Sequence, residues 1–224
     1  MPQLLIVAFL VFSLIGPTSS FAEKSPSDKY FNRAAGFAIT KNPDWHFLSL
    51  DNAETWMTDL NNSEEGKLQL KQHIQGLREQ EARTGMPPLF IAKHEEPYPD
   101  LNPMIHVSLH YIDDLPKDVS PLAIAAVMAK SVSENNEGVE MMDRIRLVQV
   151  SNIDAGYLSF VLNGESDSEE NESAINQVYL IPRGKYVFEI TLSTPLELDT
   201  DTEADLEEMM EMMDSIFILK PFEI

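Results

Sequence analysis

Two histidines lie four residues apart in the stretch His106-Val107-Ser108-Leu109-His110. Zinc proteases use this spacing on a helix, where two imidazoles one turn apart bind one ion and an adjacent glutamate acts as general base. Here Val107 takes the place of that glutamate, and the alternation of apolar and polar residues predicts a strand. Four residues of a strand span about 13 Å, so the two histidines would not share an ion. The spacing therefore does not predict a zinc protease.

A strand places alternate side chains on opposite faces, so the two histidines and the serine between them share one face. We expect polar residues of neighbouring strands to continue this row. The polar groove expected on one face of the sheet consists of His106, Ser108, His110, Ser159, Glu189 and Thr191. Its alternative is an ordinary solvent-exposed sheet face.

A looser metal site is possible across the hairpin that this strand forms with the preceding one. It would use His94 or Glu95 together with His106. The alternative is that these are half-exposed polar residues on the less buried face of the sheet. We favour that alternative, and we predict no cofactor, no bound metal and no catalytic residue.

Three other patterns resemble sites but favour simpler interpretations. Gly164–Ser168 nearly matches the G-x-S-x-G motif of hydrolases, but Ser168 replaces the last glycine and acids crowd the central serine. The acidic run 164–173 lacks the D-x-D-x-D-G pattern of calcium loops and indicates a solvated loop. The methionines between 209 and 213 could suggest a soft copper site, but their helical spacing predicts core packing.

The elements that must position these residues are mostly strands. Strands rich in Val, Ile, Tyr and Phe are expected at 89–94, 104–112, 144–151, 157–164, 175–182 and 185–193. Helices are expected from about 63, from 120 and over 201–214. Most adjacent strands are antiparallel, and the helices fall at the front, middle and end of the chain. The pattern predicts an α+β fold, with a central antiparallel β-sheet flanked by helices.

The N-terminal residues indicate export. An apolar run from Leu4 to Ile15 is followed by small residues up to Ala22, which predicts a signal peptide over 1–22 with cleavage after Ala22. An uncleaved anchor is the alternative. We expect a flexible lead-in over 23–35 and a single domain over 36–224, without any later membrane span.

Charge and cysteine content narrow the possible partners. The net charge of −21, from 37 acids and 16 bases, disfavours nucleic acid and anionic membranes as partners. The chain has no cysteine, which excludes disulfides, thiol catalysis and a lipoprotein anchor. We therefore expect a periplasmic or secreted protein.

The segment AAGFAITKNPDW, at 34–45, raises the question of how the mature domain begins. Phe37 and Ile39 alternate with small residues, which predicts a strand. Asn42-Pro43-Asp44 has turn chemistry, and the residues from Trp45 onward read as a returning strand. We interpret the segment as the first hairpin of the domain.

The order of these elements resembles the PsbP-like fold family. That family includes the photosystem II extrinsic protein PsbP, a Ran-binding nuclear import factor and bacterial DcrB-type envelope proteins. The residues that carry the resemblance are Gly36, Phe37, Ile39, Pro43, Trp45 and Gly184-Lys185-Tyr186. It implies a PsbP-like α/β/α sandwich that binds or assembles rather than catalyses. Many bacterial members are lipoproteins, and the missing cysteine departs from that pattern.

These observations favour an exported, non-enzymatic binding or accessory protein that engages a protein partner or a small ligand in the bacterial envelope. One alternative is a periplasmic hydrolase or metal-binding protein that uses His94, His106 and His110. The other alternative is a secreted effector.

Overall fold

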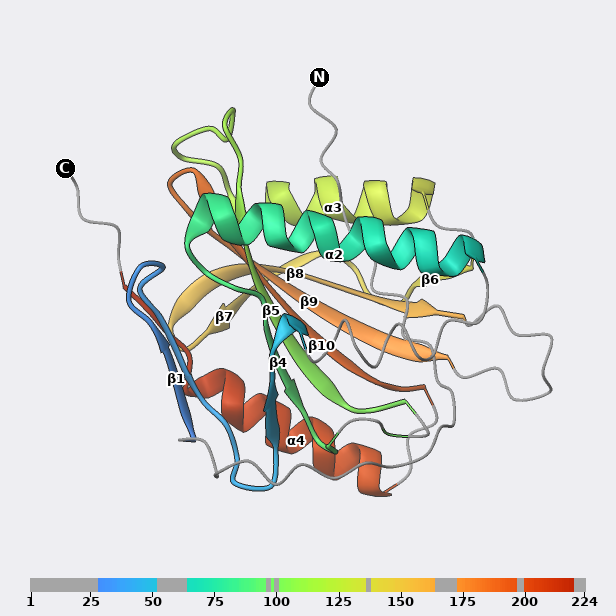
Figure 1. The fold of residues 1–224 in the computed structure, drawn as a ribbon. Helices are drawn as coiled ribbons and strands as arrows, with labels where there is room; N and C mark the ends of the chain where they lie inside the picture. Colours follow the sequence, from blue (N-terminus) through green and yellow to red (C-terminus); the bar gives the residue numbers. More distant parts are fainter. Residues whose placement is uncertain are drawn as a thin grey trace.

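A computed structural model describes residues 28–51, 64–95, 98, 101–135, 138–163, 173–196 and 200–219. Within these residues the chain forms two β-sheets and three α-helices. The long strands are buried on both faces along most of their length, whereas the helices bury one side against a sheet. The expected α+β class, a central antiparallel sheet flanked by helices, is confirmed (Figure 1).

The large sheet is antiparallel at every described pair of strands. Its order is β3 (His46–Leu48), β4 (Leu89–Ala92), β5 (Met104–Tyr111), β10 (Tyr186–Pro195), β9 (Ala174–Arg183), β8 (Ile153–Leu162) and β6 (Val139–Met141), with β7 (Arg146–Val150) also paired to β8. The strands expected from the sequence are therefore confirmed, and the short β6 is an addition to them.

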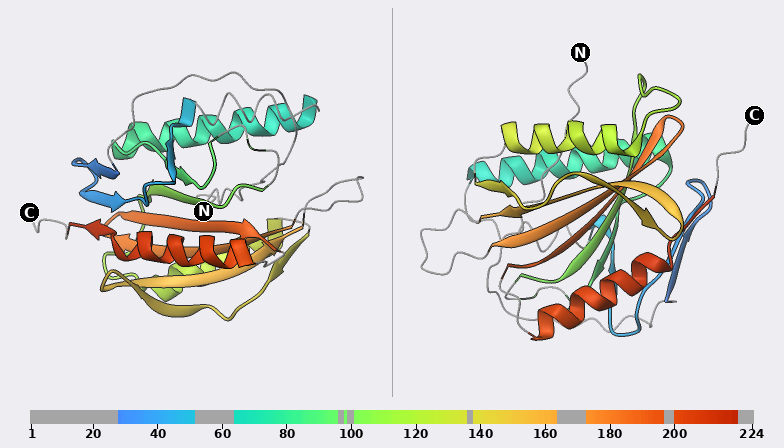
Figure 2. Two further views of the ribbon diagram at one scale, coloured as in Figure 1. Left: turned by 90° about the horizontal axis from the view of Figure 1, so that it is seen from below. Right: turned by 180° about the vertical axis from the view of Figure 1, so that it is seen from behind.

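A second, smaller sheet and the helices cover the two faces of the large sheet. The small sheet has the order β1 (Lys29–Asn32), β2 (Phe37–Thr40) and β11 (Phe217–Ile218). The helices are α2 (Glu64–Thr84), α3 (Pro121–Asn135) and α4 (Thr200–Asp214). Helices α2 and α3 lie together on one face, and α4 lies on the other (Figures 1 and 2). These are called the α2/α3 face and the α4 face below.

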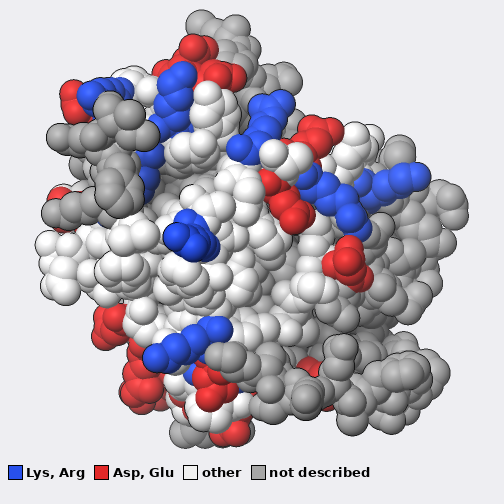
Figure 3. Space-filling view, turned by 60° about the vertical axis from the view of Figure 1, so that its left-hand side comes forward, with Lys and Arg blue, Asp and Glu red and all other residues white. Residues whose placement is uncertain are grey.

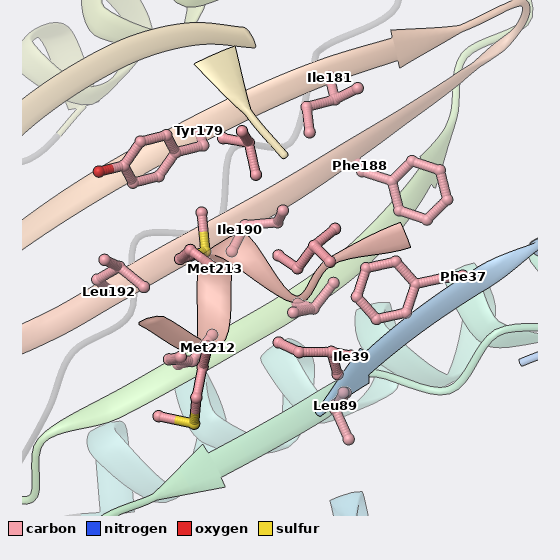
Figure 4. Packing of buried hydrophobic residues seen from close by; sticks show 14 of the residues in the cluster. Phe37, Ile39, Leu89, Tyr179, Ile181, Phe188, Ile190, Leu192, Met212 and Met213 are labelled. Carbon is pink, nitrogen blue, oxygen red and sulfur yellow. The ribbon is translucent and has the colours of Figure 1, made fainter. Parts of the chain in front are cut away.

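The α4 face holds the largest apolar core. Side chains from β2, β4, β9, β10 and α4 converge there (Figure 4). Met209, Met212 and Met213 are buried in this core, whereas Met210 is exposed. Unbranched methionine side chains fill irregular space between a helix and a sheet. The prediction that most of these methionines pack in the core is confirmed.

The α2/α3 face holds two smaller apolar clusters, one under each helix. Ile74 and Leu77 of α2 pack with Phe90 of β4. Helix α3 packs on β8 and β9 through side chains that include Val132 and Leu158. Strands β5 and β10, which lie between these clusters, carry residues of the polar row that the sequence identified.

The prediction that residues 34–45 begin the domain as a hairpin is wrong. Strand β2 does not pair with β3; it pairs with β1 and β11, while β3 pairs with β4 in the other sheet. The predicted turn is present, since the backbone N–H of Trp45 donates to the carbonyl of Asn42 at 3.1 Å. The segment therefore carries the chain from one sheet to the other.

The second half of the segment 23–35, which we expected to be a flexible lead-in, is structured instead. Residues 29–32 form β1, and Tyr30 packs against Phe37 with the ring centroids 6.3 Å apart. Polar composition suggested a loose segment, but an edge strand needs only one buried side. Tyr30 supplies that side, so the folded domain begins before residue 36.

Candidate functional site

The predicted polar row is assembled by β5 and β10. His106, Ser108 and His110 alternate along β5, and the antiparallel register places Thr191 opposite His106 and Glu189 opposite Ser108. Directly opposed residues of an antiparallel pair point to the same side. These five residues therefore share the α2/α3 face, as the sequence analysis expected.

Ser159 does not belong to this group. It lies on β8, where Leu158 packs beneath α3 on the α2/α3 face. Successive strand residues point to opposite faces, so Ser159 faces the other way, and its Oγ donates to Asp143 at 3.3 Å. The sequence alone does not give the register of β8 against its neighbours. The pairing of β8 with β9 places Ser159 on the α4 face.

The row lies beneath the helices rather than along an open groove. His106, Ser108 and Thr191 are 5%, 4% and 7% exposed. The polar row is extended by Ser193, whose Oγ donates to Asn176 Oδ1 at 2.7 Å. The row forms a polar seam between the α2 and α3 clusters. The partly exposed end of this seam is at His110 and Glu189.

At that end a serine, a histidine and a glutamate come together. The Nε2 atom of His110 lies 2.8 Å from Ser108 Oγ and 3.0 Å from Glu189 Oε2. In a catalytic triad the serine and the acid contact different ring nitrogens, so that the ring accepts a proton on one side while the acid orients the other. Here both partners contact the same nitrogen. This arrangement can fix the histidine, but it cannot relay a serine proton through the ring.

The speculative metal site of His94, Glu95 and His106 is not brought together. Strand β4 places Phe90 opposite His106, and His94 lies four residues further along, or about 13 Å in an extended chain. The His106 ring stacks on Phe90 with centroids 4.7 Å apart, whereas the His94 ring stacks on Tyr98 at 4.0 Å. Among the residues that the structure describes, no group of three His, Asp or Glu could hold a metal ion.

Two other predicted patterns cannot be placed. Gly164–Ser168, and all of the acidic run 164–173 except Ser173, lie outside the described residues. Ser173 donates to Asn163 Oδ1 at 3.2 Å.

A surface hollow of about 410 Å³ lies where β5 ends and β10 begins, and the sequence analysis did not identify it. It is lined by Arg83, Tyr111, Asp113 and Tyr186. Tyr111 and Tyr186 are directly opposed across the two strands, with their ring centroids 5.3 Å apart. The sequence contained one indication of this hollow, since Tyr186 directly follows the Gly184-Lys185 turn. Only the strand pairing shows that Tyr111 lies next to it.

An apolar surface lies on the outer side of the small sheet. Phe31 of β1 and Phe217 of β11 are both in register with Ala38 of β2, so they point to the same side, away from the core. Leu219 follows at the end of β11, where its backbone N–H donates to the carbonyl of Gly36 at 2.8 Å. We call Phe31, Phe217 and Leu219 the apolar patch.

None of the described helices is both long and apolar enough to cross a bilayer.

The sequence has no match among known families: no family model fits it, and no curated protein is significantly similar. Solved structures do match. One is a protein from Bacteroides thetaiotaomicron VPI-5482, with TM-score 0.45, 14% identity and 88% of this chain covered. This chain spans half of that protein's length.

Two further solved structures match over most of both chains. LpqN, involved in cell envelope biogenesis of Mycobacterium tuberculosis, has TM-score 0.47 and 14% identity, with 83% of each chain covered. PsbP from the cyanobacterium Synechocystis sp. PCC 6803 has TM-score 0.46 and 10% identity, with 91% of this chain and 98% of that chain covered. A PsbP is thus among the similar structures, in keeping with the resemblance to the PsbP-like family.

Proposed function

We propose that this chain is an exported binding or accessory protein of the bacterial envelope, not an enzyme, and that it engages a protein partner. The observation that carries the proposal is the apolar patch. Phe31, Phe217 and Leu219 are 60%, 53% and 44% exposed on one side of the small sheet. Neighbouring large apolar side chains on a surface typically mark a site that another molecule covers.

The geometry of the polar seam supports a role in binding rather than catalysis. Ser108, the hydroxyl nearest to His110, is buried, and it shares one ring nitrogen with Glu189. A nucleophile has to reach its substrate and transfer its proton to a base. The seam therefore favours a structural role for these residues.

An envelope location is supported by the sequence. The apolar run Leu4–Ile15 ends shortly before small residues, as secretory signals do. The lack of cysteine in this sequence is in keeping with a periplasmic or released protein.

A pull-down with the tagged full chain from an envelope extract tests the proposal. We expect the wild type to retain the same protein reproducibly, and the Phe31→Ser/Phe217→Ser variant to lose most of it. Both side chains are largely exposed, so the thermal unfolding midpoint should change little. Val127→Ser/Met142→Ser is the matched control, because these residues are similarly exposed but lie outside the patch. No retained partner, or equal retention by the patch variant, would contradict the proposal.

A further inference from the structure

The two tyrosines of the hollow belong to a row that crosses three strands. Tyr186 is opposed to Tyr111 on one side and to Arg183 on the other. Lys185 Nζ lies 5.9 Å from the centroid of the Tyr111 ring. Arg83 reaches the same hollow from the last turn of α2. The lining of the hollow thus combines two aromatic rings with Arg83, and Lys185 lies against one of these rings.

Within the described ranges, three basic residues at or near the hollow lack the ion pairs that some other cations of this chain form. Lys41 and Lys93 are both ion-paired. By contrast, Arg33, Arg83 and Lys185 form no ion pair with any residue in the described part of the chain. In a protein with 37 acids and 16 bases, cations that stay unpaired at one place create a local positive potential. Such a potential attracts an anionic partner.

The hollow adjoins the apolar patch. The turn between β1 and β2, which contains Arg33, lies against the end of α2, because Asn32 Nδ2 donates to the carbonyl of Gly85 at 3.2 Å. The same turn receives the backbone hydrogen bond of Leu219. Figure 3 shows this side of the molecule as a broad uncharged area with Lys and Arg side chains in it and along its upper border, and with acids toward its margins.

We propose that the hollow recognises an acidic segment of the partner protein, with a carboxylate bound by Arg83 and Lys185 and an apolar side chain against Tyr111 and Tyr186. This inference rests on the proposed function and adds the chemistry of the partner. Arginine binds carboxylates through two parallel hydrogen bonds. Asp113 on the same rim repels a dense polyanion, so the hollow suits isolated carboxylates interspersed with apolar residues.

A protein segment fits these observations better than an anionic membrane does. The whole chain carries a charge of −21, so a bilayer of anionic lipids would repel most of its surface. Screening limits the attraction of the few basic residues to within about 8 Å at physiological salt. A hollow can admit a single side chain, whereas a bilayer presents a flat surface.

The test is an NMR titration of the ¹⁵N-labelled full chain with the synthetic peptide Glu-Asp-Phe-Glu-Asp-Leu-Glu. We expect amide shifts centred on Arg83, Tyr111, Asp113 and Tyr186, which weaken with added salt. The Arg83→Glu/Lys185→Glu variant should bind at least about tenfold more weakly, because both contacts become repulsive. Lys71→Glu/Lys130→Glu is the control, since it makes the same charge change at exposed positions elsewhere. A peptide with lysine at every acidic position should give no shifts.

Four outcomes would overturn the inference. The first two are an absence of amide shifts at the hollow and equal peptide binding by the charge-reversed variant. The third is co-sedimentation with phosphatidylglycerol vesicles that requires Arg83 and Lys185, and the fourth is a dimer in sedimentation velocity that requires the same two residues. The third would assign the hollow to a membrane, and the fourth to a second copy of the chain. The pull-down separates the two proposals. If the wild type and the charge-reversed variant retain one partner equally, the binding function stands and the hollow is excluded as its site.

Discussion

At the scale of single residues, Lys93 connects three segments of the chain. Its Nζ atom lies 2.6 Å from Glu208 Oε2 and 3.0 Å from Asp205 Oδ1, both on α4. It also lies 5.5 Å from the centroid of the Trp45 ring, and Trp45 Nε1 donates to Glu208 at 2.5 Å. Trp45 is therefore held by contacts with α4 rather than by a hairpin.

The directions of two pKa shifts indicate the pH range over which this network stabilises the fold. Burial raises the pKa of Glu208, but hydrogen bonds from Lys93 and Trp45 outweigh it, and the net pKa is lowered. Burial lowers the pKa of Lys93, but Glu208 and Asp205 raise it above its ordinary value. Glu208 thus adds stability above its unfolded pKa of about 4.3 and loses it as the pH falls. Lys93 adds stability below about 10.4 and loses it as the pH rises through its folded pKa.

Lys93→Met should lower the free energy of unfolding at pH 7 by about 2–3 kcal/mol, because Asp205 and Glu208 then face each other without a cation. Without Lys93, burial would raise the pKa of Glu208 in the folded state, so the deficit relative to the wild type should grow from pH 5 to pH 8. Urea unfolding at several pH values measures this. Lys130→Met is the control, since its ion pair with Glu134 is exposed and contributes little. A deficit that does not depend on pH would contradict the network.

At the scale of elements, the contact of α3 with β8 depends on a glycine. A Cβ atom built on Gly156 would lie 2.1 Å from the carbonyl oxygen of Pro121 and 2.9 Å from the Cβ of Ala125. Both neighbours belong to the first turns of α3, and one of them is backbone. The helix therefore reaches its packing distance only because residue 156 has no side chain.

Gly156→Ala should destabilise the protein by about 3 kcal/mol, since the helix must move away from the sheet and part of its apolar cluster opens. The change in the urea midpoint measures this effect. Gly76→Ala is the matched control, because a Cβ atom there would meet nothing within 4 Å. That change should stabilise α2 by about 0.5–1 kcal/mol. Equal effects of the two substitutions would show that the approach of α3 to β8 is not limited by space.

At the scale of the whole molecule, residues 1–22 contain no charged side chain, so their removal leaves the net charge unchanged. We expect expression of the full-length sequence in a Gram-negative host to give a periplasmic protein whose mass corresponds to a chain beginning at Glu23. Intact-mass spectrometry of the fractions measures this. Ala22→Arg should block cleavage, since the peptidase requires a small residue at that position. A full-length mass in the membrane fraction of the wild type would instead indicate an uncleaved anchor.

The local features of this protein were determined by its sequence. Alternation along 104–111 predicted which side chains share a face, and the spacing of the methionines predicted their burial. Such patterns depend on neighbours along the chain, and their period follows from backbone geometry. The α+β class followed from the order of these elements.

Only the tertiary structure decided which segments meet. Strand β2 pairs with β1 and with β11, and β11 lies almost at the other end of the chain. Ser159 faces away from the polar seam. The hollow joins Arg83, Tyr111 and Tyr186 from three distant segments. Strand pairing and helix docking depend on the packing of surfaces that are far apart in sequence, and local periodicity carries no information about such partners.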